Sequence, residues 1–485
     1  MAGTRSWRLT PPPWRGTPRA RTARFVAVSA LAGCVVAAGA VGAAGPWDGG
    51  QRRAERERAA AGPAAGRDGA GRPVRPAAPP VLAALGGRAT APLPGRDGLA
   101  GALDGLLKDS ALGAQTSAAV VDVATGQQLY GADQDTAYTP ASTIKTATAA
   151  AALAALGPDH RIETTAVADG DTVVLVGGGD PTLTARPAGE GTPPAASLKE
   201  LADATARGLK ARGKGRVKVA YDTSRYSGPA LHAIGPNENI APVSALMVDE
   251  GRLDDSDHGP ADRTTDPAGD AARKFAGMLR DAGVDVDGDP AAGRAGGTAE
   301  RLASVSSPPL SALVERTLTN SDNDIAEALA RQTALASGQP ADFEGAARAV
   351  IARLEKLGLP LPGARIADGS GLDRADHVSA AFLAGLLARA ADPERPELRP
   401  VLTGLPVAGF SGTLSGRYGP EAAGRGLVRA KTGTLTGVNT LSGTVVDADG
   451  RLLSFAFMTM DAPSGPTAQE ALDRLATTVA GCGCR

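Results

Sequence analysis

The chain has few aromatic residues, histidines, lysines, asparagines and cysteines, and these shortages narrow the range of functions. Only 3% of its 485 residues are aromatic, which argues against a site built from aromatic stacking. The net charge of −1 provides no general attraction to nucleic acid or to acidic partners. The four histidines are scattered and form no H-E-x-x-H motif. We therefore expect no metal, no other cofactor and no nucleic-acid partner.

Other common site motifs are also missing. The glycine run 177–179 is followed by neither G-x-G-x-x-G nor G-K-[ST], so a turn is a better interpretation than a phosphate loop. No G-x-S-x-G elbow occurs, so a Ser-His-Asp hydrolase is poorly supported. Cys482 and Cys484 are one residue apart, and a disulfide between them would close a strained loop.

Against this background, three short motifs follow one another along the chain. They are Ser142–Lys145 (STIK), Ser321–Asn323 (SDN) and Lys431–Gly433 (KTG). The chain has only nine lysines and five asparagines, and two of those lysines and one of those asparagines fall in these motifs. Each motif alone is weak, but the ordered set is typical of serine penicillin-binding proteins and class A β-lactamases.

The first motif has the chemistry of an activated serine. A serine hydroxyl is a poor nucleophile until a neighbouring base takes its proton. On a helix, Lys145 would lie one turn after Ser142 on the same face. A lysine acts as a base only when its pKa is lowered, either by burial or by another cation. Lys431 is a candidate for that second cation.

The other two motifs supply groups that a peptide substrate needs. Ser321 could pass a proton to a leaving amine, and Asn323 could hold the substrate amide. The hydroxyls of Thr432 and Thr434, on either side of Gly433, could bind a substrate carboxylate. Backbone N–H groups of Ser142 and Thr434 could form an oxyanion hole.

The local sequence favours a suitable element for each motif. The alanine-rich run 146–156 predicts a buried helix that ends at Gly157, with Ser142 at its start. The SDN motif directly precedes the predicted helix 324–336 and therefore indicates a loop and an N-cap. The KTG motif lies in a predicted strand, 427–436. A lysine on a strand facing a serine at a helix start would form a cleft.

Further segments make the resemblance more specific. The chain resembles the D-alanyl-D-alanine carboxypeptidase/endopeptidase family, the penicillin-binding protein 4 (DacB-type) low-molecular-mass penicillin-binding proteins, over roughly residues 96–480. Besides the three motifs, the similar segments are Leu175–Leu183 (LVGGGDPTL), Tyr221–Pro229 (YDTSRYSGP), Ala241–Asp249 (APVSALMVD), Asp368–Leu372 (DGSGL) and Leu405–Gly409 (LPVAG).

The resemblance implies a fold and a set of roles. It implies an α/β fold of the α+β sandwich type, a penicillin-binding transpeptidase/β-lactamase-like domain with a large inserted domain. It implies that Ser142 is acylated, that Lys145 is the base, and that Ser321, Asn323 and Lys431 complete the site. The 179-residue spacing from Ser142 to Ser321 looks shorter than in the larger family members, so the insert is expected to lack a subdomain that those members carry.

The N-terminus predicts a targeting segment. Residues 1–24 carry six arginines and no acidic residue, and the 21 residues 25–45 are apolar and uncharged. A membrane anchor with a basic cytoplasmic tail is the first interpretation. A signal peptide cleaved near Ala38–Ala40 is the second, and a lipoprotein with a lipidated Cys34 is the third. Each places the enzyme outside the cytoplasm, membrane-anchored or secreted to the cell wall.

Composition and periodicity divide the rest of the chain. Residues 46–95 are rich in Ala, Pro, Gly and Arg and predict a disordered linker. The serine D,D-peptidase domain is expected over 96–164 and 301–481, and an inserted domain over 165–300. Further predicted elements are helices at 99–107, 268–282 and 468–479, and strands at 118–123, 127–130, 172–176, 217–221, 438–446 and 452–460.

The function expected is that of a serine-type D-Ala-D-Ala carboxypeptidase, with D,D-endopeptidase activity as a further possibility. Its partners would be peptidoglycan stem peptides and, as covalent inhibitors, β-lactam antibiotics. A D,D-transpeptidase shares the acyl-enzyme and differs only in the acceptor. A class A β-lactamase needs a Glu-x-x-Leu-Asn motif, but no asparagine lies between Asn323 and Asn439. A non-enzymatic scaffold would be expected to have lost Ser142 or Lys145.

Overall fold

The computed structural model describes residues 91–187 and 195–484, which belong to one unit of the chain, Ala84–Arg485. The predicted basic tail, the apolar segment and nearly all of the predicted linker lie outside the described residues. Within those ranges, every helix is too short or too polar to cross a bilayer.

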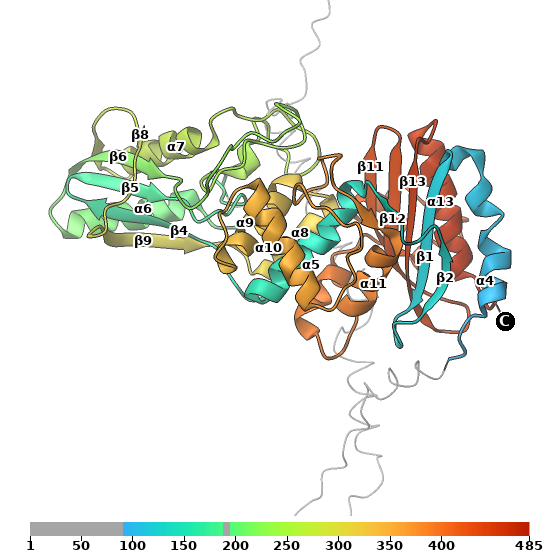
Figure 1. Cartoon of the computed structure of the whole chain (residues 1–485). Coiled ribbons are helices and arrows are strands. Elements are labelled where there is room, and N and C mark those ends of the chain that lie inside the picture. Colours follow the sequence, from blue (N-terminus) through green and yellow to red (C-terminus); the bar gives the residue numbers. More distant parts are fainter. Residues whose placement is uncertain (1–90, 188–194, 485) are drawn as a thin grey trace, which may run out of the picture. The chain divides into compact units, whose positions relative to one another are not determined.

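A five-stranded antiparallel sheet carries the KTG motif at one edge (Figure 1). In spatial order its strands are β11 (Arg429–Leu435), β12 (Val438–Val446), β13 (Leu452–Met460), β1 (Gln115–Asp122) and β2 (Gln128–Ala132). The central strands β12 and β13 are buried along nearly their whole length. A sheet that is covered on both faces requires such continuous apolar strands.

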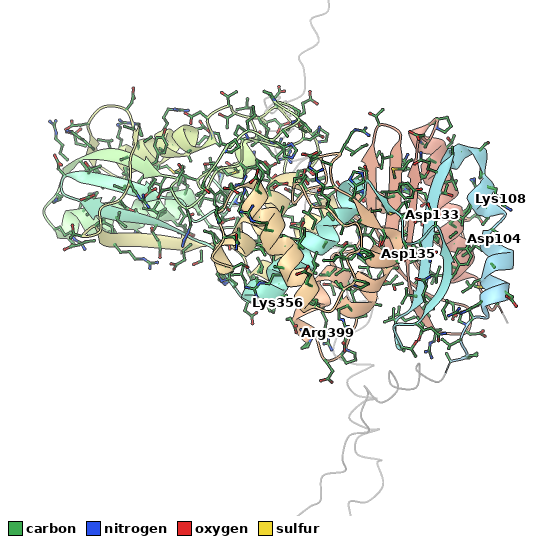
Figure 2. All side chains as sticks on the ribbon, in the orientation of Figure 1. Asp104, Lys108, Asp133, Asp135, Lys356 and Arg399 are labelled. Carbon is green, nitrogen blue, oxygen red and sulfur yellow. A yellow bond between two sulfur atoms is a disulfide. The ribbon has the colours of Figure 1, made fainter. Side chains whose placement is uncertain are left out.

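Alternate residues of these strands face two different helical layers. Phe455 and Phe457 stack with a ring separation of 5.1 Å and pack with the apolar sides of α4 (Arg96–Leu103) and α13 (Gly465–Ala480). Ala456 faces the opposite layer. Burial of a side chain as large as phenylalanine stabilises the fold by about 1.5–3 kcal/mol. Asp104, labelled in Figure 2 just after α4, accepts a hydrogen bond of 2.7 Å from Tyr130 on β2.

The opposite layer is a group of helices around α5 (Lys145–Leu156), which is buried through Leu153. Its alanines have small side chains, so α9 (Asn323–Ala336) and α10 (Phe343–Lys356) pack directly against it. Gly157 ends the helix at φ 82°, a left-handed conformation that suits glycine. The helices of this layer and its surroundings are α8 (Leu310–Asn320), α9 (Asn323–Ala336), α10 (Phe343–Lys356), α11 (Ala380–Ala390) and α12 (Arg399–Thr403).

A second sheet with its own core lies between the first two motifs in the sequence (Figure 1). Its strands are β4 (Glu163–Asp169), β5 (Thr172–Val176), β6 (Arg216–Asp222), β7 (Asp285–Val286), β8 (Ala291–Ala292) and β9 (Glu300–Ser306). The helices α6 (Leu198–Ala211) and α7 (Pro267–Asp281) connect parallel strand pairs and cover the sheet. A short two-stranded ladder joins β3 (Ala137–Tyr138) to β10 (Val378–Ser379).

Most predicted elements are found, and the differences are local. Strands β5, β12 and β13 have the predicted bounds, and α7 is shifted by one residue at each end. The helix predicted at 99–107 ends at Leu103, and a separate 3₁₀ turn follows at Leu106–Lys108. Cys482 and Cys484 are paired as a disulfide. The bounds of the inserted domain stay a prediction, although its sheet runs from Glu163 to Ser306.

Candidate active site

The first motif begins in a tight turn. Ala141–Ile144 forms a 3₁₀ helix that leads into α5, so Ser142 lies just before the α-helix. In a 3₁₀ helix, side chains three residues apart eclipse one another. The Lys145 Nζ is accordingly 2.9 Å from the Ser142 Oγ. Ala141 has a φ of 48°, which costs a non-glycine residue on the order of 1 kcal/mol and is often found at functional sites.

The amine of Lys145 contacts two further acceptors. It donates to the Oδ1 of Asn323 at 2.7 Å and to the carbonyl oxygen of Ser370 at 2.5 Å. A protonated lysine has three N–H donors, and Ser142, Asn323 and Ser370 together accept all three. Lys145 of the first motif and Asn323 of the second, 178 residues apart in sequence, therefore meet at one buried nitrogen.

The second motif joins two helices. Ser321 ends α8 in the left-handed conformation with a φ of 60°. Asp322 is the N-cap of α9, where its carboxylate accepts a hydrogen bond of 2.9 Å from the N–H of Ile325. Asn323 is the first residue of the helix, one residue earlier than predicted. This sharp corner lets Ser321 and Asn323 both face the catalytic turn.

The third motif lies on the edge strand β11, as predicted. The Nζ of Lys431 donates to the Oγ of Ser321 at 2.9 Å and to the carbonyl oxygen of Thr432 at 2.8 Å. The Thr432 hydroxyl is 2.8 Å from that of Thr413, and Thr434 accepts a weak 3.4 Å contact from Gln469. The third motif is thus linked to the second through Lys431 and Ser321.

Gly433 permits the close approach of β11 to the serine turn. A Cβ at this position would lie 2.1 Å from the Oγ1 of Thr440 and 2.6 Å from the carbonyl oxygen of Pro140. Neither distance is compatible with a side chain, and the Pro140 atom belongs to the backbone directly before the turn. A glycine is therefore required here by space.

These residues border a cleft of about 470 Å³. Of the predicted residues, Ser142, Ser321, Asn323, Thr432 and Thr434 line it, whereas Lys145, Gly433 and Lys431 are buried and do not line it. Both lysines are fully buried. Part of the lining comes from the segment between the first two motifs, through Asn239, Arg252, Gly259, Pro260 and Arg263.

Burial sets the protonation of the two lysines. Burial lowers the pKa of Lys145 to about 8, although the charges of Asp368 and Asp322 act to raise it. The pKa of Lys431 is lowered well below its ordinary value by burial and by the positive charge of Lys145. The sequence offered two causes for a lowered pKa of Lys145, burial and the charge of Lys431. Burial lowers the pKa of Lys145, whereas the charge effect between the two lysines lowers the pKa of Lys431.

One loop of the site had no predicted role. In the sequence the Asp368–Leu372 segment shows only a family similarity, yet its Ser370 carbonyl contacts Lys145. The loop is held by Thr148, whose hydroxyl donates to the carbonyl oxygen of Gly369 at 2.7 Å, and by Glu327, which accepts from the Gly369 N–H at 2.9 Å. An Asp-Gly-Ser-Gly sequence indicates a tight turn, but nothing in it reveals which side chain its carbonyl will meet.

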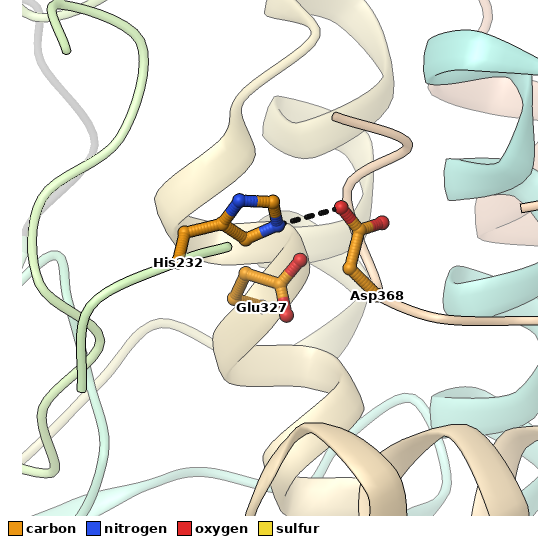
Figure 3. A group of neighbouring side chains, drawn as sticks. All are labelled: His232, Glu327 and Asp368. Carbon is orange, nitrogen blue, oxygen red and sulfur yellow. Dashed lines mark hydrogen bonds and ion pairs between the residues drawn. The ribbon is translucent and has the colours of Figure 1, made fainter. Parts of the chain in front are cut away.

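Two buried groups of side chains in the described residues have metal-ligand chemistry. In the first, drawn in Figure 3, His232 donates from its Nε2 to Asp368 at 2.8 Å beside Glu327. In the second, Glu250 and Asp324 are paired with arginines. Because His232 is already paired with Asp368, and Glu250 and Asp324 with arginines, we assign neither group to a metal. His232, expected from the sequence to be an ordinary residue, is nevertheless bonded to Asp368 in the same loop whose Ser370 carbonyl contacts Lys145.

Comparison with known proteins identifies the family of the chain. Residues 99–261 and 256–479 match the D-Ala-D-Ala carboxypeptidase 3 (S13) family. The chain belongs to this family. It is 40% identical to the carboxypeptidase DacB of Mycolicibacterium smegmatis over 427 residues, covering 85% of this chain and 90% of that protein. It is 30% identical to a D-alanyl-D-alanine carboxypeptidase of Actinomadura sp., covering 78% and 84%.

A solved structure supports the fold. The crystal structure of penicillin-binding protein 4 (dacB) from Haemophilus influenzae superposes with a TM-score of 0.64 at 22% identity, covering 79% of this chain and 98% of that one. The predicted family and fold class, a transpeptidase-like domain with a large insert, are confirmed. So is the class of enzyme, a serine-type D-Ala-D-Ala carboxypeptidase.

Adding a methyl group at Gly433 tests the close approach of β11. We expect Gly433→Ala to push the strand from the serine turn and to lower the rate of acylation by a β-lactam at least about tenfold, since misplacement by about 1 Å costs a reaction far more than that. Stopped-flow labelling would measure it. Gly101→Ala, in α4 where a new Cβ meets nothing within 4 Å, is the matched control. An unchanged rate in Gly433→Ala would contradict the spatial requirement.

Proposed function

We propose that Ser142 is the acylated nucleophile of a carboxypeptidase that removes the terminal D-alanine from peptidoglycan stem peptides. The observation that carries this proposal is the hydrogen bond between the Lys145 amine and the Ser142 hydroxyl at 2.9 Å. A serine paired with a buried lysine has the base that it needs at hand. Roles for the other residues follow from their positions around this pair.

The first half of the reaction forms an ester. Neutral Lys145 takes the proton of Ser142 as the Oγ attacks the carbonyl carbon between the last two D-alanines. The carbonyl oxygen becomes an oxyanion, which the N–H groups of Ser142 and Thr434 stabilise. As the C–N bond breaks, the proton that Lys145 took from Ser142 passes through Ser321, which is hydrogen-bonded to Lys431 at 2.9 Å, to the leaving amine, and Lys145 becomes neutral again. Free D-alanine departs, and the shortened stem remains as an acyl-serine.

The second half releases the product. Lys145, neutral again, takes a proton from a water molecule that attacks the ester carbonyl. The ester C–O bond breaks, Ser142 regains its proton, and the shortened stem leaves as a carboxylic acid. Attack by an amine instead of water would give transpeptidation from the same ester. β-Lactams acylate Ser142 because their ring presents a similar carbonyl and carboxylate.

Substrate recognition is assigned to the cleft wall. Thr432 and Thr434 line the cleft beside Ser142 and present hydroxyls to the terminal carboxylate. Asn323 also lines it and can hold the substrate amide while its Oδ1 stays on Lys145. The cleft extends from the motifs to Arg252 and Arg263. That additional length favours D,D-endopeptidase activity as a second function, because the leaving amine of a cross-bridge belongs to a whole second stem.

Removing the proposed nucleophile tests this function directly. We expect wild-type protein to take up one fluorescent penicillin per molecule and to release D-alanine from a stem pentapeptide, and Ser142→Ala to do neither. Ser304→Ala, on the exposed side of β9, is the matched control and should behave as wild type. Intact-mass spectrometry and a D-alanine assay measure the two activities. Full release by Ser142→Ala would refute the assignment, and transfer to an added D-amino acid would identify transpeptidation.

The protonation of Lys145 sets the expected pH dependence. Because the base must be neutral and its pKa is about 8, the acylation rate should rise about tenfold per pH unit below pH 8 and level off above it. Single-turnover labelling between pH 6 and 9.5 measures this profile. Lys145→Met should lose acylation, while Lys356→Met, at an exposed position, should keep the wild-type profile. A flat profile would remove Lys145 from the role of base.

The apolar segment 25–45 is proposed to anchor the enzyme, with its catalytic part outside the cytoplasm. This rests on the six arginines that precede it and on its length of 21 residues. The full chain is expected to stay with membranes after an alkaline wash, and a chain lacking residues 1–45 is expected not to be exported. Release of the full chain as a shortened soluble protein would instead favour the cleaved signal.

A further inference from the structure

A short segment, residues 232–241, contacts Asn323 at the start of α9 and the loop of Ser370, which both present acceptors to Lys145. We call it the bracing segment. Near its start, the Nε2 of His232 is 2.8 Å from the Oδ2 of Asp368. Near its end, the carbonyl oxygen of Asn239 accepts a hydrogen bond of 2.9 Å from the Nδ2 of Asn323. One continuous stretch of chain thus supports the loop of Ser370 and the side chain of Asn323, the two acceptors of Lys145 besides Ser142.

The carboxylate of Asp368 organises the loop that follows it. Its Oδ1 accepts from the N–H groups of Ser370 at 3.0 Å and Gly371 at 2.5 Å, and its Oδ2 accepts from the N–H of Asp373 at 2.8 Å. These bonds wrap the backbone around one side chain. The direction of the Ser370 carbonyl therefore depends on how that carboxylate is held.

His232 is well placed to hold it (Figure 3). The imidazole is buried and packs edge-on against Phe343, with ring centres 5.3 Å apart and planes at 84°. Its Nδ1 accepts a hydrogen bond of 3.2 Å from the N–H of Ile234. That contact assigns the ring proton to Nε2, so His232 donates to Asp368 even when the ring is neutral.

The direction of the Lys145 lone pair gives this arrangement its chemical importance. A neutral amine has two N–H donors and one lone pair. When Asn323 and Ser370 accept the two donors, the lone pair is left facing the Ser142 hydroxyl. If the Ser370 carbonyl moved away, the amine could turn about its Cε–Nζ bond, and the lone pair would spend less time on Ser142. A base must reach the proton it removes with this geometry.

We propose that His232 is a positioning residue for the acylation step. It acts through Asp368 and the Ser370 carbonyl to orient the amine of Lys145, and it touches no substrate itself. The inference deepens the proposed function and rests on it, since it requires Lys145 to be the base for Ser142. It also assigns a catalytic task to the segment between the first two motifs, which supplies the bracing segment.

Two substitutions separate the hydrogen bond from the volume of the ring. The amide of His232→Gln ends near the place of Nε2 and can still donate to Asp368, whereas His232→Leu has a similar size and cannot. Single-turnover labelling over a range of fluorescent penicillin concentrations yields the acylation rate at saturation and the affinity of the initial complex. We expect His232→Leu to lose at least about tenfold in the saturating rate, with little change in affinity, and His232→Gln to stay within about threefold of wild type.

The stoichiometry of labelling distinguishes positioning from folding. A merely structural role predicts fewer labelled molecules that react at the wild-type rate, whereas the proposal predicts full labelling at a reduced rate. If His232→Leu does not fold, His232→Asn, whose amide ends near the place of Nδ1, replaces it. His258→Leu, at an exposed histidine, is the control and should match wild type.

The outcomes also separate this inference from the proposed function. Normal acylation of wild type, with His232→Leu equally fast or His232→Gln equally slow as His232→Leu, would overturn the inference alone. Failure of wild type to be acylated at Ser142 would overturn the proposed function and the inference with it.

Discussion

The arrangement of the three motifs in the candidate active site depends on one buried nitrogen. The Nζ of Lys145 is within hydrogen-bond distance of Ser142, Asn323 and Ser370. These three groups come from the catalytic turn, from the start of α9 and from the loop before β10. Each of these three elements packs against different neighbours. Their hydrogen bonds to the Lys145 amine fix their positions relative to one another. An unpaired amine at this depth would be costly, so every acceptor around it also serves stability.

The charges around Lys145 are balanced between two demands. A lysine base must release its proton near neutral pH, but a buried amine surrounded by carboxylates would keep it. Burial raises the pKa of Glu327 to about 7, with the charge of Asp368 adding to the effect. It raises the pKa of Asp376 to about 10, again with Asp368 contributing. The charges of Glu327 and Asp376 still act to raise the pKa of Lys145, but less than the charge of Asp368 does, and burial outweighs them all.

Asp368 is the exception among these carboxylates. Burial alone would raise its pKa, but hydrogen bonds from His232 and Gly371 outweigh burial and lower it. Asp368 therefore stays charged, and its carboxylate keeps accepting the hydrogen bonds from the N–H groups of the loop that follows it. The surroundings of Lys145 thus separate two tasks. The ionised carboxylate of Asp368 shapes the loop, while Glu327 and Asp376 raise the pKa of Lys145 less than Asp368 does.

The sequence could predict the elements whose pattern is local. Strands β12 and β13 are apolar runs on either side of a turn, and their bounds were predicted correctly. The helix of the first motif was predicted from its alanines, but not the 3₁₀ turn before it, because the φ of 48° at Ala141 reflects tertiary packing. Strand β9 was missed since it is largely exposed and lacks a strong apolar pattern.

The residues of the candidate site likewise fall into those that a local sequence pattern reveals and those that only the tertiary structure reveals. The lysines, the serines and Asn323 could be named because the order of three motifs limits the chemistry. His232 and Ser370 could not, since the contact between His232 and Asp368 spans 136 residues and Ser370 contributes only a backbone carbonyl to Lys145. Every residue has a backbone carbonyl, so the residue type does not indicate which carbonyl contacts a catalytic group. A lone histidine on an apolar segment is most often an ordinary core residue.

Strain at the motif borders has a consistent explanation. Ala141 and Ser321 both adopt left-handed backbone conformations, and each lies at a point where a catalytic side chain must leave its helix toward the cleft. Such conformations persist only when the surrounding structure over-determines them. At Ala141 the strand β11 presses against the turn through Gly433, and at Ser321 the hydroxyl is held by Lys431. The KTG strand thus supports both strained corners, while the bracing segment supports Asn323 and the Ser370 loop. The site depends on both supports, so no single motif could form it alone.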